Sequence, residues 1–159
     1  MIRKLQQSDR DSLEKILRRI STFNPNDVEV ALELIDIAIT VPSQTDYYLF
    51  VYEEEKNIYG YYCIGKRPLT DAVYDLYWIV VDPLASKKGI GSELLLSAEN
   101  FVRNLNGRWF LAETSSKESY TKTRNFYLKN NFEIVTEIQD FYSLGDSLMI
   151  FGKYLWNKN

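Results

Sequence analysis

One segment near the middle of the chain restricts the fold more than any other. Residues 72–81 are almost continuously apolar, which indicates a central strand that is covered on both faces. The chain then passes Asp82 and Pro83 and reaches Gly89 and Gly91, where apolar residues begin to recur at helical spacing. The other elements are therefore assigned around a buried strand that leads through a short loop into a helix.

The rest of the sequence predicts an alternation of helices and strands, with no internal repeat or linker. We expect helices over residues 8–20, 25–41, 89–106 and 120–130. We expect strands over residues 2–6, 47–53, 58–66, 72–81, 108–114, 133–140 and 147–155. The order is β-α-α-β-β-β-α-β-α-β-β, which predicts a mixed α+β domain whose sheet is predominantly antiparallel and flanked by helices.

Helix ends give more specific signals. Ser8 with Asp11 three positions later resembles a capping box. Asn24 is a suitable N-cap, with Asp27 in the first helical turn. Asn131 can take the left-handed conformation that closes the last helix.

Composition excludes several classes of function. The net charge of −3 and a pI near 5.1 provide no basic surface for nucleic acid or anionic lipid. The chain has no histidine and a single cysteine, Cys63, which excludes serine–histidine and cysteine–histidine catalysis and most zinc sites. No apolar run reaches the roughly 18 residues of a membrane span, and the first residues lack a signal-peptide pattern. We expect a cytoplasmic protein with no metal site.

The junction after the central strand is a candidate phosphate site. Free N–H groups at a helix start attract anions, and glycines let a phosphate approach the backbone closely. Lys87 and Lys88 add positive charge in the loop before Gly89. The spacing matches neither a P-loop nor a dinucleotide-binding fingerprint.

Two motifs resemble those of the GCN5-related N-acetyltransferases (GNAT family). Val81-Asp82-Pro83 and Lys87-Lys88-Gly89-Ile90-Gly91 resemble the family's first motif, although Ser86 replaces its usual Arg or Gln. Residues 123–132, T-R-N-F-Y-L-K-N-N-F, resemble A-R-x-F-Y-x-x-x-G-F, and the predicted element order is also that of the family. The resemblance implies a single N-acetyltransferase domain over residues 1–159, with the acyl-CoA N-acyltransferase fold.

The resemblance also implies acetyl-CoA as the cofactor. In the family, the pantetheine arm pairs with the backbone of the fourth strand, and the pyrophosphate binds at the start of the following helix. The corresponding cofactor-binding residues are Ile79, Val80, Val81, Lys87, Lys88, Gly89, Ile90, Gly91 and Ser92.

The candidate catalytic residues are Tyr127, Asp75 and Glu113. Tyr127 corresponds to the family's general acid, the proton donor to the CoA sulfur, although it could instead be a half-buried packing residue. Without histidine, a carboxylate or a water chain must accept the amine proton. Asp75 is the first candidate, or a strand aspartate paired with a neighbouring Lys or Arg; Glu113 and Glu33 are reserves that could be surface acids.

The implied activity is transfer of an acetyl group directly to an amine of a small molecule, an amino acid or a protein. An alternative is a non-catalytic module that binds or senses acyl-CoA. Homodimers are common among similar proteins, and the sequence leaves the oligomeric state and the acceptor open. We expect neither nucleic acid nor membrane as a partner.

Overall fold

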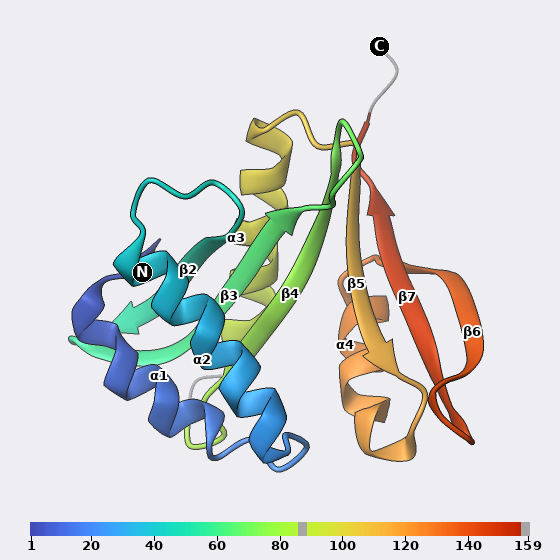
Figure 1. Cartoon of the computed structure of the whole chain (residues 1–159), viewed down its shortest axis with the longest axis horizontal. Helices are drawn as coiled ribbons and strands as arrows, with labels where there is room; N and C mark the ends of the chain where they lie inside the picture. The colour runs from blue at the N-terminus through green and yellow to red at the C-terminus, as the bar shows by residue number, and fades with distance from the viewer. Residues whose placement is uncertain (86–88, 157–159) are drawn as a thin grey trace. The chain divides into compact units, whose positions relative to one another are not determined.

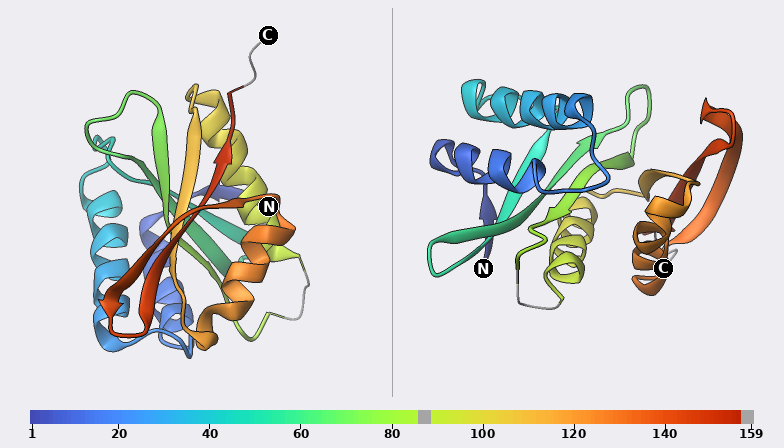
Figure 2. Two further views of the ribbon diagram at one scale, coloured as in Figure 1. Left: turned by 90° about the vertical axis from the view of Figure 1, so that its right-hand side faces the viewer. Right: turned by 90° about the horizontal axis from the view of Figure 1, so that it is seen from below.

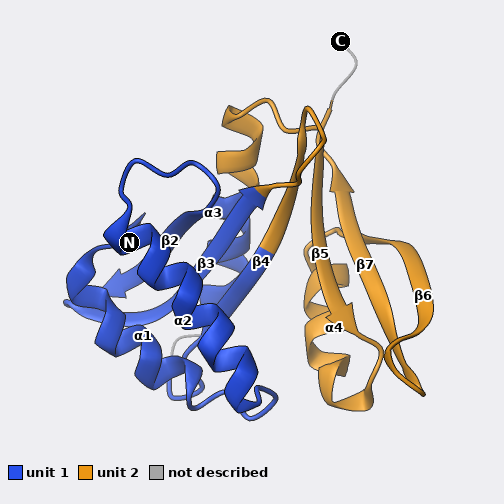
Figure 3. Ribbon diagram, in the orientation of Figure 1, with its two compact units in different colours: residues 1–65, 77–98 blue, residues 66–76, 99–159 orange. Residues whose placement is uncertain are grey.

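The structure is a computed structural model that describes residues 1–85 and 89–156 (Figure 1). The chain divides into two compact units (Figure 3). Unit 1 comprises Met1–Gly65 and Tyr77–Ala98, and unit 2 comprises Lys66–Leu76 and Glu99–Asn159. Each unit is therefore assembled from two separate stretches of chain.

The observed elements confirm the predicted order and the mixed α+β class. The strands are β1 (Ile2–Lys4), β2 (Tyr48–Glu54), β3 (Asn57–Lys66), β4 (Val73–Val81), β5 (Trp109–Ser115), β6 (Glu133–Ser143) and β7 (Asp146–Tyr154). The helices are α1 (Arg10–Leu17), α2 (Pro25–Thr40), α3 (Ile90–Asn104) and α4 (Thr121–Lys129), with single 3₁₀ turns at Gln7–Asp9 and Glu118–Tyr120. The strand order is β1-β2-β3-β4-β5-β7-β6, and only the pairing of β4 with β5 is recorded as parallel among the described residues.

In unit 1, helices cover both faces of the sheet (Figure 2). Leu13 of α1 and Ile35 of α2 are completely buried against Val51 and Tyr61 of the strands. On the opposite face α3 lies so close that a Cβ at Gly60 would crowd the side chain of Leu94. This two-sided burial explains why the strands carry apolar residues in near-continuous runs.

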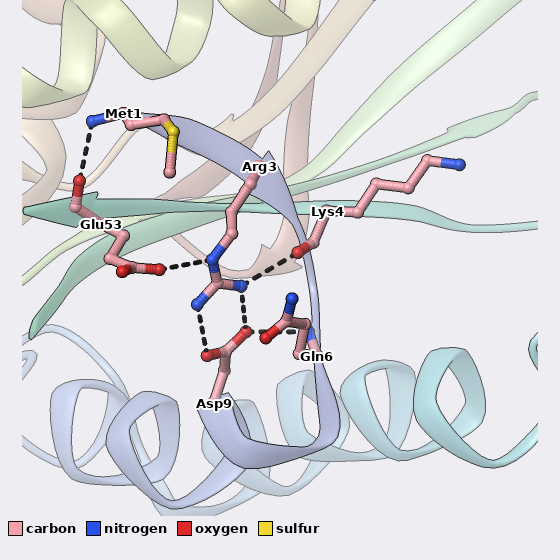
Figure 4. A network of polar contacts seen from close by, with 6 residues as sticks. All are labelled: Met1, Arg3, Lys4, Gln6, Asp9 and Glu53. Carbon is pink, nitrogen blue, oxygen red and sulfur yellow. Dashed lines mark hydrogen bonds and ion pairs between the residues drawn. The ribbon is translucent and has the colours of Figure 1, made fainter. Parts of the chain in front are cut away.

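An ionic network joins the first strand to the start of α1 (Figure 4). The guanidinium of Arg3 donates to both carboxylate oxygens of Asp9, at 2.7 and 2.8 Å, and also to the carboxylate of Glu53 on β2. The amino group of Met1 donates to the carbonyl of Glu53 at 2.7 Å. The short β1 strand is thus held to the sheet by charge as well as by its backbone pairing.

This network corrects one predicted helix cap. The capping box forms between Gln6 and Asp9, not between Ser8 and Asp11, because Asp9 is fixed from the other side by Arg3. The cap of α2 is confirmed: Asn24 accepts from the N–H of Asp27 at 3.0 Å, and the Asp27 carboxylate accepts from the N–H of Asn24 at 2.8 Å.

In unit 2, α4 packs on one face of β5 and β7. Phe110 of β5, Phe151 of β7 and Phe132, which follows α4, are all buried, and the rings of Phe110 and Phe132 meet edge to face at 5.6 Å between centroids. Asn131 has a φ of 63°, which confirms the predicted left-handed closure of α4. β6 continues to Ser143 instead of ending at 140, because the connection to β7 is a tight turn.

Candidate active site

The predicted cofactor-binding stretch of β4 presents its backbone in two directions. The N–H of Asp82 donates to the carbonyl of Tyr59 at 2.7 Å, and a Cβ at Gly60 would overlap the carbonyl oxygen of Val80. Residues 80 and 82 therefore direct their backbone groups toward β3. Because backbone groups alternate along a strand, those of Ile79 and Val81 point to the opposite edge.

Asp82 organises the turn after β4. Its carboxylate, which is largely buried, accepts from the N–H of Leu84 at 3.0 Å and from the guanidinium of Arg19 at 2.7 Å. Its carbonyl accepts from the N–H of Ala85 at 2.9 Å. The Asp-Pro pair is thus a structural turn, held by Arg19 just after α1, that directs the chain from the end of β4.

The start of α3 has the geometry expected of a phosphate site. Gly89 has a φ of 98°, a conformation that favours glycine, and, its chain neighbours aside, a Cβ there would meet no atom of the described residues within 4 Å. Its carbonyl accepts from the N–H of Glu93 at 3.0 Å, so the amides of Ile90, Gly91 and Ser92 form the first turn, where N–H groups have no intrahelical partner. The open space fits an anion close to the backbone. Lys87 and Lys88, together with Ser86, lie outside the described residues.

The two candidate acids of unit 2 share one arginine. Asp75 lies opposite Leu111 in the parallel pairing of β4 with β5, and Glu113 follows two residues later on the same face. Arg67 donates through Nε to both oxygens of Asp75, at 3.0 and 2.9 Å, and through a terminal nitrogen to Glu113 at 2.7 Å. Asp75 is therefore paired with an arginine, and the structure joins it to Glu113 in one cluster.

The two acids differ in exposure. The side chain of Asp75 is 11% exposed, and that of Glu113 is 41% exposed. Burial raises the pKa of Asp75, Arg67 opposes the rise, and the charge of Glu113 adds to it. The sequence alone did not identify Arg67 as part of the site. A single arginine next to the β3–β4 turn carries no pattern that would assign it a role.

Tyr127 is enclosed by aromatic rings. Its side chain is buried, with ring centroids at 5.5 Å from Phe126, 5.7 Å from Phe132 and 5.4 Å from Phe151. Burial raises the pKa of its phenol, which keeps the hydroxyl protonated at neutral pH. The ring is thus fixed in position, and its hydroxyl carries a proton that it can donate.

The segment between β5 and α4 is clamped by residues that sequence reasoning did not assign. Arg124 donates to the carbonyls of Ser115 and Lys117 at 2.8 and 2.7 Å. The hydroxyl of Ser115 donates to the carboxylate of Asp146, which lowers the pKa of that carboxyl, and accepts from the N–H of Lys117 at 3.0 Å. The arginine of the second motif therefore fixes the entry into the helix that carries Tyr127.

The remaining candidates lie elsewhere. Glu33 is exposed on α2. Cys63 is completely buried, and burial raises the pKa of its thiol, which disfavours the reactive thiolate. Within residues 1–85 and 89–156, no three His, Cys, Asp or Glu side chains are grouped as metal ligands. In the same part of the chain, no helix combines the length and apolar character of a membrane span.

Comparison with known proteins identifies the family. The family model described as acetyltransferase (GNAT) domain matches residues 45–134, more than half of the chain. This chain belongs to the GNAT family of acetyltransferases. The match spans both motifs, so the family predicted from the sequence is confirmed and the protein is an N-acetyltransferase.

Solved structures support the same assignment. A protein from Desulfovibrio desulfuricans assigned to the GNAT family is 31% identical, with a TM-score of 0.92 over 97% of this chain and 98% of its own. An aminoglycoside 6′-N-acetyltransferase complexed with coenzyme A is 16% identical, with a TM-score of 0.76 over 100% and 99% of the two chains. The Salmonella typhimurium acetyltransferase yncA, solved with acetyl-CoA, is 16% identical, with a TM-score of 0.77 over 100% and 95%. A comparison with curated proteins gave no match.

The aminoglycoside 6′-N-acetyltransferase was solved with coenzyme A, and yncA was solved with acetyl-CoA. The two structures below 25% identity show the fold of this chain and leave its acceptor open.

Proposed function

We propose that this enzyme transfers an acetyl group from acetyl-CoA directly to an amine of a small molecule, an amino acid or a protein. The proposal depends on one observation. Unit 2 contains both a buried, protonated tyrosine, Tyr127, and a pair of carboxylates, Asp75 and Glu113. Transfer to an amine needs a proton donor for the departing thiolate and a proton acceptor for the amine. These groups supply both functions without histidine.

Unit 1 supplies the proposed cofactor-binding residues. The amides of Gly89, Ile90, Gly91 and Ser92 would hold the pyrophosphate, and Lys87 and Lys88 would add charge. The backbone groups of Ile79 and Val81, which point away from β3, would pair with the extended arm, whereas Val80 packs its side chain into the core. Acetyl-CoA supplies an activated thioester. The N–H of Ile79 is the proposed donor to the oxyanion that develops at the acetyl carbonyl.

The proposed proton acceptor is the Asp75–Glu113 pair. Both oxygens of Asp75 already accept from Arg67, whereas the side chain of Glu113 is more exposed. This difference favours Glu113 as the group that takes the proton, directly or through water, with Asp75 holding Arg67 in place. An alkylammonium is only about one part in a thousand neutral at pH 7, so such help is required.

The proposed proton donor is Tyr127. As the acceptor nitrogen bonds to the acetyl carbon and the carbon–sulfur bond breaks, the phenol gives its proton to the sulfur while a carboxylate takes one from the amine. Burial keeps the phenol of Tyr127 protonated, so its proton is available to the thiolate as the carbon–sulfur bond breaks. The aromatic rings around Tyr127 support this role because they hold its ring in one position.

The finer features of the activity are part of the same proposal. Residues 1–159 act as one N-acetyltransferase domain, supported by a family match that takes residues from both units. The proposed acceptor is a small-molecule or peptide amine, the proposed location is the cytoplasm, and neither nucleic acid nor a membrane is a proposed partner. The charge of −3 suits a cationic amine.

The test is acetyl-CoA-dependent thiol release across a panel of aminoglycosides, polyamines, amino acids and peptides with free amino termini. We expect release with at least one amine class, with the acetylated amine detected by mass spectrometry. Tyr127→Phe is the control for enzyme-dependent release. Binding of acetyl-CoA without release for any amine would refute the catalytic proposal and favour the binding-module alternative.

A further inference from the structure

Arg19 differs from its neighbour Arg18 in the partner that it reaches. Arg18 donates to the carboxylate of Glu14, one turn earlier on α1, at 2.6 and 2.9 Å. Arg19 lies just beyond α1 and donates through Nη1 to Oδ2 of Asp82, 63 positions away in the sequence, at 2.7 Å. Arg19 therefore connects the end of α1 to the turn after β4, and both ends of this link belong to unit 1.

The carboxylate of Asp82 depends on this contact for its charge balance. Its side chain is only 10% exposed, so water screens the charge poorly. Oδ1 accepts from the N–H of Leu84 at 3.0 Å, and Oδ2 accepts from Arg19. The N–H of Leu84 satisfies a hydrogen bond but carries no net charge. Without Arg19, the carboxylate would lose the cation that contacts it.

The turn lies beside the proposed phosphate site. A Cβ at Gly60 of β3 would come within 3.1 Å of the Leu94 side chain and within 3.2 Å of the Cα of Val81. Leu94 begins the second turn of α3, and Val81 directly precedes Asp82. The end of β4 and the first turns of α3 therefore meet at one point of β3, with the open space at Gly89 one turn before Leu94.

The charge of Asp82 opposes an anion at that place in two ways. A like charge repels the anion, and the repulsion is strong where little water intervenes. A carboxylate close to the start of a helix also competes for the free N–H groups that would bind the phosphate. Arg19 counters both effects, because it neutralises Asp82 and holds Oδ2 in an ion pair.

We propose that Arg19 is a positioning residue for the pyrophosphate of CoA. It acts through Asp82, whose charge it neutralises and whose orientation it holds, and not through contact with the cofactor. The inference rests on the proposed binding of acetyl-CoA at residues 89–92. It adds to that site a residue outside both sequence motifs, from the segment that follows α1.

Calorimetric titration with CoA tests the role of Arg19. Arg19→Gln should weaken binding roughly 5- to 20-fold, the order that Coulomb's law gives for one like charge about 10 Å from the anion at an effective dielectric constant of about 20. Arg19→Lys should retain most of the affinity, because lysine keeps the cation. The matched control is Arg18→Gln, which makes the same change of charge one position away and should bind CoA as the unmodified chain does.

A second substitution separates neutralisation of Asp82 from a general effect on folding. Asparagine at position 82 can still accept from the N–H of Leu84 but has no charge. Arg19→Gln combined with Asp82→Asn should therefore bind CoA within about 2-fold of the unmodified chain, which a double-mutant cycle measures as coupling between the two positions. All titrations are made well below the thermal transition of each variant, so that a loss of stability does not lower the folded fraction.

The outcomes distinguish this inference from the proposed function. Unchanged affinity in Arg19→Gln, an equal loss in Arg18→Gln, or the same loss with and without Asp82→Asn would each overturn the role of Arg19 while CoA binding stands. An unmodified chain that does not bind CoA would overturn the proposed function together with this inference.

Discussion

Replacing Arg67 by glutamine tests the electrostatics of the acid cluster. Arg67 makes charge-assisted hydrogen bonds to the mostly buried Asp75 and to the more exposed Glu113. The pair with Glu113 is screened by water and contributes little. Losing the bonds to Asp75 should reduce the free energy of unfolding by about 1–2 kcal/mol at neutral pH, after solvent screening of the partly exposed arginine. For a chain of this length the melting temperature should fall by roughly 2–8 °C.

The loss should depend on pH in a definite direction. Burial raises the pKa of Asp75, and Arg67 supplies the influences that lower it. In Arg67→Gln the arginine no longer lowers the pKa of Asp75, whereas burial and the charge of Glu113 still raise it, so this pKa should be higher than in the unmodified chain. A carboxyl whose pKa is higher in the folded state contributes stability below its unfolded pKa, and that stability is lost as the pH rises through the folded pKa. The variant should therefore be less impaired at about pH 4.5 than at about pH 7.

Thermal unfolding of the variant and the unmodified chain at both pH values provides the measurement. Arg108→Gln is the matched control. Arg108 also forms an ion pair within unit 2, with Asp71, but this pair is exposed to solvent. The control should show no measurable loss at either pH. If Arg67→Gln lost the same stability at both pH values, or no more than Arg108→Gln, the assignment of a raised pKa to Asp75 would be wrong.

Three further predictions concern activity and binding. Tyr127→Phe should lower kcat by roughly 10²- to 10⁴-fold with nearly constant affinity for CoA. Acyl donors with more acidic thiols should recover part of the lost rate. Normal turnover of the variant would contradict the role of Tyr127 as the acid. Gly89→Glu should abolish the rise in melting temperature that CoA causes, whereas Gly145→Glu, also at a positive φ with open space around its Cβ, should retain it. Glu113→Gln should lower kcat/KM chiefly at neutral pH, with recovery at high pH where the amine is deprotonated, and a larger effect of this kind in Asp75→Asn would return the proton-acceptor role to Asp75.

Local signals in the sequence sufficed for most of the fold. The box at Asn24 and Asp27 depends on contacts within one turn, and the closure at Asn131 depends on the conformational preference of one residue. The capping pair before the first helix was assigned to the wrong residues, because Asp9 is held by Arg3, which belongs to another element. Capping residues can therefore be predicted when their partners are local, and fail when a distant side chain competes.

The site was predictable in composition but not in its connections. Tyr127 and Gly89 were assigned by motif, and their roles remain predictions. The link from Arg67 to Glu113 spans 46 positions in the sequence, so no spacing rule could identify it.

The interleaved course of the chain limits how such an enzyme can be divided or recombined. Because unit 1 ends its first stretch at Gly65 and resumes at Tyr77, a cut at any single peptide bond leaves at least one unit incomplete. The interruptions fall inside β3, β4 and α3, which each contribute residues to both units. A gene fusion that joined the first half of this chain to the second half of a distant relative would have to preserve the packing of the divided unit across its junction.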